Sequence, residues 1–308
     1  MKKYLIATAI LVVAALTARA DLDTAKIDQI TGLKGKMNQA EGVYKVTFPR
    51  DDVKVSVAGW QMPPFMGLGT WAAFQGTNEK AMMMGDTVIF EDEVNPVMSA
   101  ALDSGLTVTA LHNHFFFDEP KVYFMHIGGE GSIEKLAGGV RKVYDTIKTI
   151  RGPNAKPTAA FDQATAEKGK LPEKSSITAA PLNEIFAMQG EAKDGMLKFT
   201  IGKKSKMGGM EIGKEIGVNT WAAFAGTDDN AVVDGDFAVT EDELQPALKT
   251  LRKAGINIVA IHSHMTHENP RILFLHYWGR GSAKDLANAI KGALLVTGLS
   301  GVTTSASN

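Results

Sequence analysis

An internal duplication constrains this chain more than any other feature of its sequence. The stretch GTWAAFQGT at 69–77 returns as NTWAAFAGT at 219–227, an offset of 150 residues. The same offset aligns GDTVIFEDEV with GDFAVTEDEL and GSIEKLA with GSAKDLA. Two copies are too few for a solenoid, so we expect either two separate domains or one pseudo-symmetric unit. The first repeat domain is predicted at 21–150 and the second at 182–308, joined by a linker at 151–181 that is rich in Pro, Ala and Lys.

The pattern within one copy predicts an α+β fold, with a mainly antiparallel sheet and two helices. Short apolar runs such as VYKVTF, VKVSVAGW, TWAAFQG and MMMGDTVIF are typical of strands. A first helix is expected to begin near Asp92, and a second to follow Ser132, whose side chain can cap it. The first helix has apolar residues at the spacing of a buried stripe, namely Val94, Val97, Met98, Ala101 and Leu102.

The first twenty residues have the three parts of a secretory signal peptide. Lys2 and Lys3 form a basic start, an apolar run follows from Tyr4 to Thr17, and Ala-Arg-Ala at 18–20 is a cleavage signal. The apolar run is shorter than the roughly 20 residues that span a bilayer. We therefore expect a signal peptide at 1–20, a periplasmic or secreted protein, and no transmembrane segment after cleavage. An uncleaved membrane anchor is the alternative.

The composition excludes several classes of function. The chain has no cysteine, which rules out disulfides, thiolate metal sites, cysteine nucleophiles and a lipid-modified N-terminal cysteine. It has 33 basic and 34 acidic residues without a basic stripe, so no nucleic-acid partner is expected. The sequence leaves the oligomeric state open.

All seven histidines lie in two segments, LHNHFFFDEPKVYFMH at 111–126 and IHSHMTHENPRILFLH at 261–276. Each segment is predicted to form a β-hairpin around its acidic turn. With Glu119 as the centre of the turn, His112 faces His126, and the alternation of side chains puts His114 on the same face. Three imidazoles then converge on one patch of the sheet. The second copy repeats this arrangement with His262, His264 and His276.

Three converging imidazoles can hold a divalent metal, with Zn as the first expectation and Cu as the second. The spacing is the same in both copies, although the loop changed from FFFDE to MTHEN. Hydrogen-bonded structural histidines are the alternative interpretation. The predicted ligands are His112, His114, His126, His262, His264 and His276.

Several other repeated residues lie near the histidines in the sequence. Asp118 and Glu268 align at the turn and could supply a fourth ligand or a general base on a metal-bound water, although an ordinary turn residue is the simpler interpretation. The repeated Gly-Asp pairs, which end in Asp86 and Asp236, are typical first of turns and second of carboxylates that orient a ligating histidine. The tryptophans at 71 and 221 are expected in the core.

The two segments ALHNHFFFDEPKVYFMHIGGEGSIEKLAGGV and AIHSHMTHENPRILFLHYWGRGSAKDLANAI resemble the hallmark of the LppY/LpqO family of exported proteins, a domain of unknown function. The resemblance covers nearly the whole mature chain. It implies an envelope protein of tandem architecture and supplies no reaction. The named members of the family are lipoproteins, whereas this chain lacks the lipobox cysteine, which favours a soluble periplasmic or secreted state.

Two kinds of function stay open at this point, and whether the protein is an enzyme is undecided. The first is an exported protein that binds a divalent metal, or a small-molecule or envelope ligand, without catalysis. The second is a zinc-dependent hydrolase, in which three histidines leave one coordination position for water. A cupin-like metalloenzyme is a further alternative, since the H-x-H-to-Glu spacing fits, although cupins are nearly all β. A carboxylate or a fourth histidine, such as His267, at the fourth position would favour binding over catalysis.

Overall fold

The computed structural model describes residues 22–152, 156, 157, 169 and 171–298, so the expected signal peptide lies outside the described residues. Elements of the first copy are α1 (Thr24–Thr31), β1 (Lys36–Asn38), β2 (Val43–Pro49), β3 (Val55–Val57), β4 (Trp60–Met62), η1 (Pro64–Met66), β5 (Gly69–Gly76), β6 (Ala81–Phe90), α2 (Glu91–Asp103), β7 (Thr107–His112), β8 (Asp118–Glu119), β9 (Val122–Gly131) and α3 (Ile133–Arg151). Elements of the second copy are α5 (Ala179–Phe186), β10 (Glu191–Lys193), β11 (Met196–Gly202), β12 (Ser205–Met207), β13 (Met210–Ile212), η2 (Lys214–Ile216), β14 (Asn219–Gly226), β15 (Ala231–Thr240), α6 (Glu241–Lys253), β16 (Asn257–His262), β17 (Ile272–Gly281) and α7 (Ala283–Val296).

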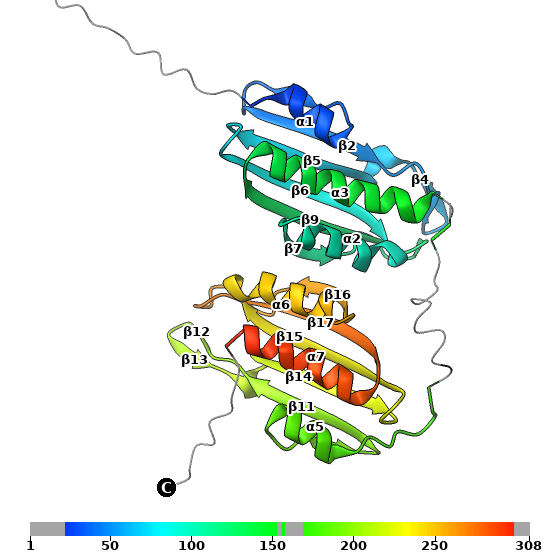
Figure 1. Ribbon diagram of the computed structural model, residues 1–308, viewed down its shortest axis with the longest axis vertical. Helices are drawn as coiled ribbons and strands as arrows, with labels where there is room; N and C mark the ends of the chain where they lie inside the picture. The colour runs from blue at the N-terminus through cyan, green and yellow to red at the C-terminus, as the bar shows by residue number, and fades with distance from the viewer. Residues whose placement is uncertain (1–21, 153–155, 158–168, 170, 299–308) are drawn as a thin grey trace, which may run out of the picture.

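The two copies share a single sheet. Among the described residues, twelve strands pair in the order β1-β2-β5-β6-β9-β7-β16-β17-β15-β14-β11-β10. The order of the second half mirrors that of the first, and the antiparallel pair β7–β16 joins the halves where Leu111 faces Ile261. Figure 1 shows the copies one above the other, with their equivalent strands related about this junction. The duplication therefore produces one pseudo-symmetric sheet, and the predicted α+β class with two copies is confirmed.

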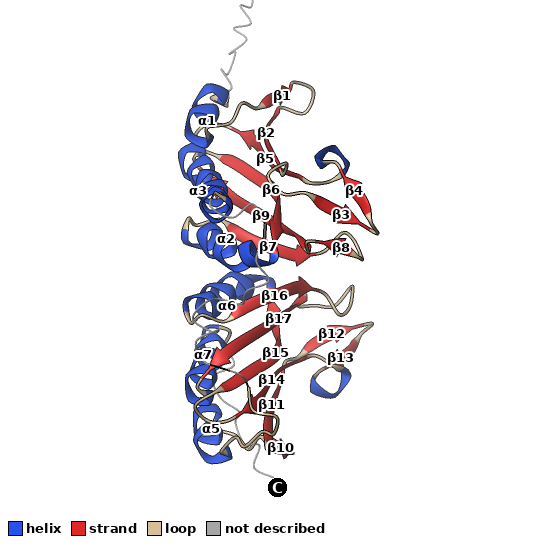
Figure 2. Ribbon diagram, turned by 90° about the vertical axis from the view of Figure 1, so that its right-hand side faces the viewer, coloured by secondary structure: helices blue, strands red, loops and turns tan. Residues whose placement is uncertain are grey.

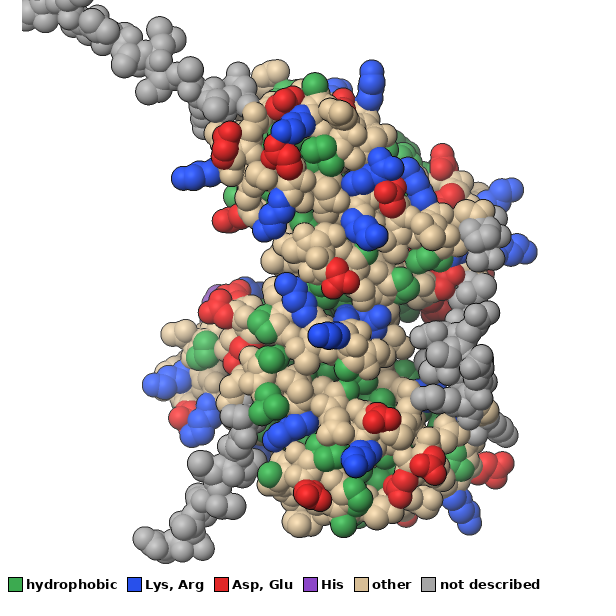
Figure 3. All heavy atoms as spheres, viewed as in Figure 1, with side chains coloured by type: hydrophobic (Ala, Val, Ile, Leu, Met, Phe, Trp, Pro, Cys, Tyr) green, Lys and Arg blue, Asp and Glu red, His purple; other side chains and the backbone are tan. Residues whose placement is uncertain are grey.

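The α-helices cover one face of this sheet, as Figure 2 shows in side view. Leu111, Met125 and Ile127 point towards the helices and belong to the main hydrophobic core. Both predicted helices are present in each copy, and Ser132 accepts the hydrogen bond of the Lys135 backbone N–H, as expected of a cap. On the helix-covered face, basic and acidic side chains are interspersed (Figure 3). No helix within the described residues is long and apolar enough to cross a membrane.

Each copy also has a short helix that the sequence pattern did not predict, α1 in the first copy and α5 in the second. Each of these helices buries only two residues, which are Ile27 and Thr31 in α1 and Leu182 and Phe186 in α5. Such a narrow contact leaves too weak an apolar stripe to be recognised in the sequence.

Side-chain amides clamp the junction between the copies. Gln245 on α6 bonds both backbone groups of Val108 on β7, at 3.0 Å to the N–H and 2.8 Å to the carbonyl. Asn95, at the equivalent position of α2, accepts from the Ile258 N–H at 2.8 Å and donates to the Ile258 carbonyl at 3.4 Å. Both strands have a bulge at this point, which interrupts their own pairing. The side-chain amide of each copy thus hydrogen-bonds the backbone N–H and C=O groups that the bulge of the other copy leaves out of its strand pairing.

The opposite face of the sheet carries no α-helix in the described residues, only the short 3-10 helices η1 and η2 beside its hairpins, and is called the helix-free face below. Two small hairpins, β3–β4 and β12–β13, project from it in Figure 2. The stretch VKVSVAGW, predicted as one strand, is instead the β3–β4 hairpin. It turns at Ala58 and Gly59, whose φ angles are 51° and 80°. The β3–β4 hairpin covers a second apolar cluster that includes Val88, Phe90 and Phe124.

Candidate metal site

The predicted ligands of the first copy come from β7, the loop after it, and β9. His112 ends β7 and His126 lies in the middle of β9. Because their neighbours Leu111 and Met125 point into the core, both histidines point to the helix-free face. The predicted register was wrong by two residues, since Phe124 faces His112 and Ala110 faces His126. A shift of two residues keeps every side chain on its face, so the histidines still meet.

The register shifted because the connection is not a short turn. Residues 113–121 separate β7 from β9, and within them Asp118 and Glu119 form β8, which pairs with β3. The loop is therefore held by the β3–β4 hairpin. Sequence spacing alone did not reveal this pairing.

In the first copy the closest contact is between His112 and His126, whose Nε2 atoms are 3.0 Å apart. The ring of His114 lies 5.2 Å from that of His112, measured between centroids. His114 also stacks on Phe124, with 3.3 Å between centroids and an interplanar angle of 6°. Phe124 thus holds the one histidine of this triad that a loop supplies.

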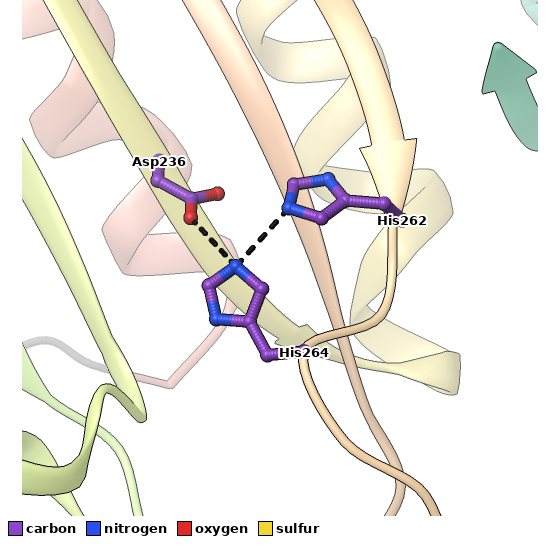
Figure 4. A group of neighbouring side chains, drawn as sticks. All are labelled: Asp236, His262 and His264. Carbon is purple, nitrogen blue, oxygen red and sulfur yellow. Dashed lines mark hydrogen bonds and ion pairs between the residues drawn. The ribbon is translucent and has the colours of Figure 1, made fainter.

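In the second copy two of the three histidines gather with a carboxylate, and Figure 4 shows this group of Asp236, His262 and His264. The Nε2 atoms of His262 and His264 are 3.1 Å apart, and His264 Nε2 lies 3.3 Å from Asp236 Oδ2. One ligand atom from each of these three residues lies within 4.8 Å of the others. His276 stacks on His262 at 4.8 Å between centroids, and His264 stacks on Phe274 at 3.5 Å.

Hydrogen bonding indicates which nitrogen of His276 is available. Its Nδ1 lies 3.3 Å from the carbonyl oxygen of Gly235. A carbonyl oxygen can only accept, so Nδ1 carries the proton and Nε2 keeps its lone pair. This is the arrangement in which a backbone carbonyl orients a metal-binding imidazole.

Burial favours the neutral, ligating form of the rings. It lowers the pKa of His262, and it lowers the pKa of His114, where the neighbouring His112 acts in the same direction. Three buried polar atoms at the sites have no hydrogen-bond partner. They are Oδ1 of Asp86, Oδ1 of Asp236 and Nδ1 of His262. Buried polar atoms without a partner are rare in proteins, so each of these atoms is a place where a bound water or ion would serve as the partner.

The observed spacing can be compared with that of a tetrahedral zinc site. At Zn–N distances of about 2.0–2.1 Å, tetrahedral geometry puts neighbouring ligand atoms about 3.3 Å apart. The contacts of 3.1 Å and 3.3 Å in the second copy, and of 3.0 Å in the first, are close to this value. A hydrogen bond from the N–H of a neutral imidazole gives this spacing, and so does a metal ion shared by the same atoms. The residues present therefore fit a metal ion.

Asp86 and Asp236 are the site residues whose position the sequence analysis missed. They were expected first in turns, yet they lie within β6 and β15. Each is the direct cross-strand neighbour of a histidine, Asp86 of His126 and Asp236 of His276. The repeated Gly-Asp pair was a signal, but only the pairing of β6 with β9 and of β15 with β17 reveals its meaning.

Asp118 and Glu268, the candidate catalytic carboxylates, accept hydrogen bonds from the backbone of their own loops. Asp118 accepts from the Val122 N–H at 2.7 Å and from Lys121 Nζ at 3.1 Å. Glu268 accepts from the Ile272 N–H at 3.1 Å. Both are buried, and each fastens the end of its own loop. His267 is exposed and does not belong to the cluster of Asp236, His262 and His264.

The two tryptophans expected in the core are only half-buried, and both lie on the helix-free face. Trp71 is the cross-strand neighbour of Asp86, and Trp221 that of Asp236. A lysine lies over each ring. Lys45 Nζ is 4.0 Å from the ring centroid of Trp71, and Lys198 Nζ is 4.5 Å from that of Trp221. The tryptophans therefore lie beside the aspartates on the same face of the sheet.

Comparison with known proteins identifies the family. Residues 25–146 and 180–296 each match the family described as Domain of Unknown Function (DUF1259). No curated protein matches the chain. A crystal structure of the trimeric bacterial microcompartment shell protein PduB is 11% identical over 85% of this chain and 89% of that chain. Its TM-score of 0.21 is too low to support an argument about fold or function.

Proposed function

The chain belongs to the DUF1259 family, and from the geometry of its sites we propose that it binds two divalent metal ions, one in each copy. The ligands are His112, His114, His126 and Asp86 in the first copy and His262, His264, His276 and Asp236 in the second. The observation that carries this proposal is the convergence of Asp236, His262 and His264 at the spacing of metal ligands. The unpartnered Asp236 oxygen supports it.

Zinc suits this set of donors best. Three imidazoles and one carboxylate form a tetrahedral nitrogen and oxygen shell of the kind that zinc accepts, and imidazole also suits copper. A fourth protein ligand fills the position that a hydrolytic zinc ion keeps for water. The carboxylates therefore favour binding over the hydrolase alternative. We further propose that the protein is exported, because its first twenty residues have the order of a signal peptide.

Elemental analysis of the purified protein tests this function. The protein is stripped with a chelator, loaded with Zn²⁺, freed of unbound metal and measured. We expect two zinc ions per chain, and one in the double variant His262→Ala/His264→Ala. His267→Ala is the matched control, because His267 lies in the same loop but outside the cluster, and it should keep both ions. A wild-type protein without stoichiometric metal would contradict the proposal, as would equal loss in the control.

A further inference from the structure

The first copy exposes a group of large apolar side chains, and we infer that this group inserts into the surface of a phospholipid bilayer. The side chains are Trp60, Phe65, Met66, Phe116 and Phe117, called the aromatic tip below. They come from the β3–β4 hairpin, from η1 and from the loop after β7. The inference goes beyond the proposed metal binding and relies only on the proposed export, which brings the protein to a membrane surface.

The exposure of the aromatic tip is the first observation. Phe65 is 99% exposed, and Phe116 and Phe117 are 79% and 81% exposed. Phe117 also has a φ angle of 59°, in the left-handed region that bulky residues rarely adopt. Folding therefore leaves three phenyl rings in water and holds one of them in an unfavourable backbone conformation. Exposed apolar side chains that cluster in this way mark a surface for another molecule.

Strand pairing holds the segments of the aromatic tip together. Asp118, which follows Phe117, faces Val57 on β3, and Val57 faces Trp60 on β4. The Ala58 N–H donates to the Phe117 carbonyl at 3.1 Å. η1 begins two residues after the end of β4, and Figure 2 shows this short helix beside the projecting hairpin. The tip therefore belongs to one projection from the helix-free face.

The second copy shows that the fold does not need these aromatic residues. There β12–β13 and η2 form the equivalent hairpin and turn, which project from the same face in Figure 2. Glu215, Thr266 and His267 take the places of the three phenylalanines. His267 has a φ angle of 66°, so the backbone of the loop is shared as well. Packing within the chain thus does not explain the aromatic tip.

A bilayer suits the aromatic tip better than a folded partner protein does. A side chain that is 99% exposed, as Phe65 is, touches almost nothing of its own protein, so the tip projects and does not form a groove. A protein partner would need a preformed pocket for each ring, whereas fluid lipid closes around any projecting side chain. Tryptophan and phenylalanine are common at membrane interfaces, where binding strengthens with the apolar area that is buried.

The charges around the aromatic tip indicate the kind of lipid. Exposed residues of both signs flank it, with Lys54 and Lys121 basic and Asp51 and Glu119 acidic. Anionic lipids attract clusters of basic residues, and this mixed surface has no such cluster. We therefore expect apolar insertion into zwitterionic lipid, without a requirement for anionic lipid.

The equivalent projection of the second copy is not suited to the same contact. It exposes Lys206, Lys214 and Glu215, and moving these charges into apolar surroundings would cost free energy. Its exposed apolar residues are Met210 and Ile216, at the positions of Trp60 and Met66. Each chain thus has one membrane contact, through the first copy.

Cosedimentation of the purified mature protein with lipid vesicles tests the inference. One set of vesicles contains phosphatidylcholine alone, and a second set adds the anionic lipid phosphatidylglycerol. We expect equal binding to both sets and no release at high salt, because salt screens only electrostatic contacts. Absence of binding to phosphatidylcholine would overturn the inference, as would release by salt. The measurement requires neither bound zinc nor export, so failure of those proposals would be seen separately.

Variants that copy the second copy locate the contact. Phe116→Thr/Phe117→His gives the first loop the residues that the same backbone carries in the second copy, and we expect at least about tenfold weaker vesicle binding because two rings no longer insert. Phe65→Glu, which copies Glu215, should also weaken binding. Met210→Ser/Ile216→Ser is the matched control and should bind as the wild type does.

Two results would assign the aromatic tip another role. Wild-type binding by both phenylalanine variants would show that the tip does not contact lipid. A dimer that forms without lipid, depends on protein concentration and is lost in Phe116→Thr/Phe117→His would assign the tip to a second copy of the chain. Sedimentation equilibrium without vesicles measures this, and we expect a tip that leaves the oligomeric state unchanged. Either contrary result would overturn the inference.

Discussion

The two copies place the same histidines on the same strands, yet their sites differ in how closely the ligands converge. In the second copy Asp236 is almost fully buried and contacts His264, which in turn meets His262. In the first copy Asp86 is only half-buried, and the close pair is His112 with His126. The comparison shows that the carboxylate, rather than the histidine spacing, distinguishes a tightly gathered site from a looser one.

The surroundings of the two sites have diverged more than the ligands. The first loop carries Phe116 and Phe117, which are 79% and 81% exposed, where the second carries Thr266 and His267. Phe124 and Phe274, in contrast, stack on the equivalent histidines in both copies. The residues that hold the imidazoles are therefore retained while the exposed rim is not.

A similar contrast exists in the ion pairs of the first turns of α2 and α6. In the first copy Glu93 is fully buried and bonds both Arg50, at 2.7 Å, and Arg151, at 2.7 Å. In the second copy the equivalent Glu243 pairs with Lys203, and its side chain is 22% exposed. The first copy thus depends on a desolvated charge cluster where the second has a single, partly hydrated pair.

The largest expected effect is on the free energy of unfolding. Glu93→Gln should lower it by about 3–5 kcal/mol, because it removes the fully buried charge shared by two guanidinium groups, which then keep only the more exposed carboxylates of Asp52 and Asp92. Glu243→Gln should lower it by only about 1 kcal/mol, since water reaches that pair. Unfolding in urea, followed by circular dichroism, measures both. Equal losses would show that the two ion pairs do not differ in the way that their burial indicates.

The amide clamp of the junction should have the next largest effect. Gln245→Ala is expected to cost about 1–3 kcal/mol, because it leaves the backbone groups of Val108 without partners. Asn95→Ala should cost less, since one of its two bonds is long. Gln75→Ala, which removes an exposed amide, is the control and should change stability by less than about 0.5 kcal/mol. A larger loss in the control than in Gln245→Ala would contradict this account of the junction.

The aspartates sharpen the comparison of the sites directly. Asp236→Asn should weaken zinc binding in the second copy by about 10–100-fold, because it removes the charge of a residue in the cluster. Asp86→Asn should weaken the first copy by less, as Asp86 is less buried. Competition with a chromophoric chelator measures each site in a variant whose other triad is changed to alanine. Equal effects would mean that both sites adopt the same geometry once loaded.

The smallest expected effect concerns pH. Protons compete with zinc for imidazole, and burial lowers the pKa of His262 and of His114, so more acid is needed to protonate these rings. We therefore expect half of the zinc to leave only below pH of about 6.5, the ordinary value for histidine. Chelator competition between about pH 5 and 8 measures the pH at which half of the zinc is released. Half-release above it would show that burial does not protect the neutral rings.

Sequence periodicity predicted the faces of the sheet but not its pairings. Alternation was enough to put His112 and His126 on one face, and it survived a register error because the error was even. The same reasoning could not find Asp236, since its role depends on β15 lying beside β17. The junction at Leu111 and Ile261 was equally hidden, because each copy alone gives no sign of how its edge strand pairs.

X-ray absorption at the zinc edge tests the central claim most directly, because it reports the ligands of the bound metal. For protein loaded with two zinc ions per chain, the account predicts a shell of nitrogen and oxygen atoms at about 2.0–2.1 Å and outer-shell scattering from three imidazoles per zinc. Asp236→Asn should leave the imidazole scattering in place. A spectrum of oxygen ligands with no imidazole scattering would contradict the account and leave the histidines as structural residues of the sheet.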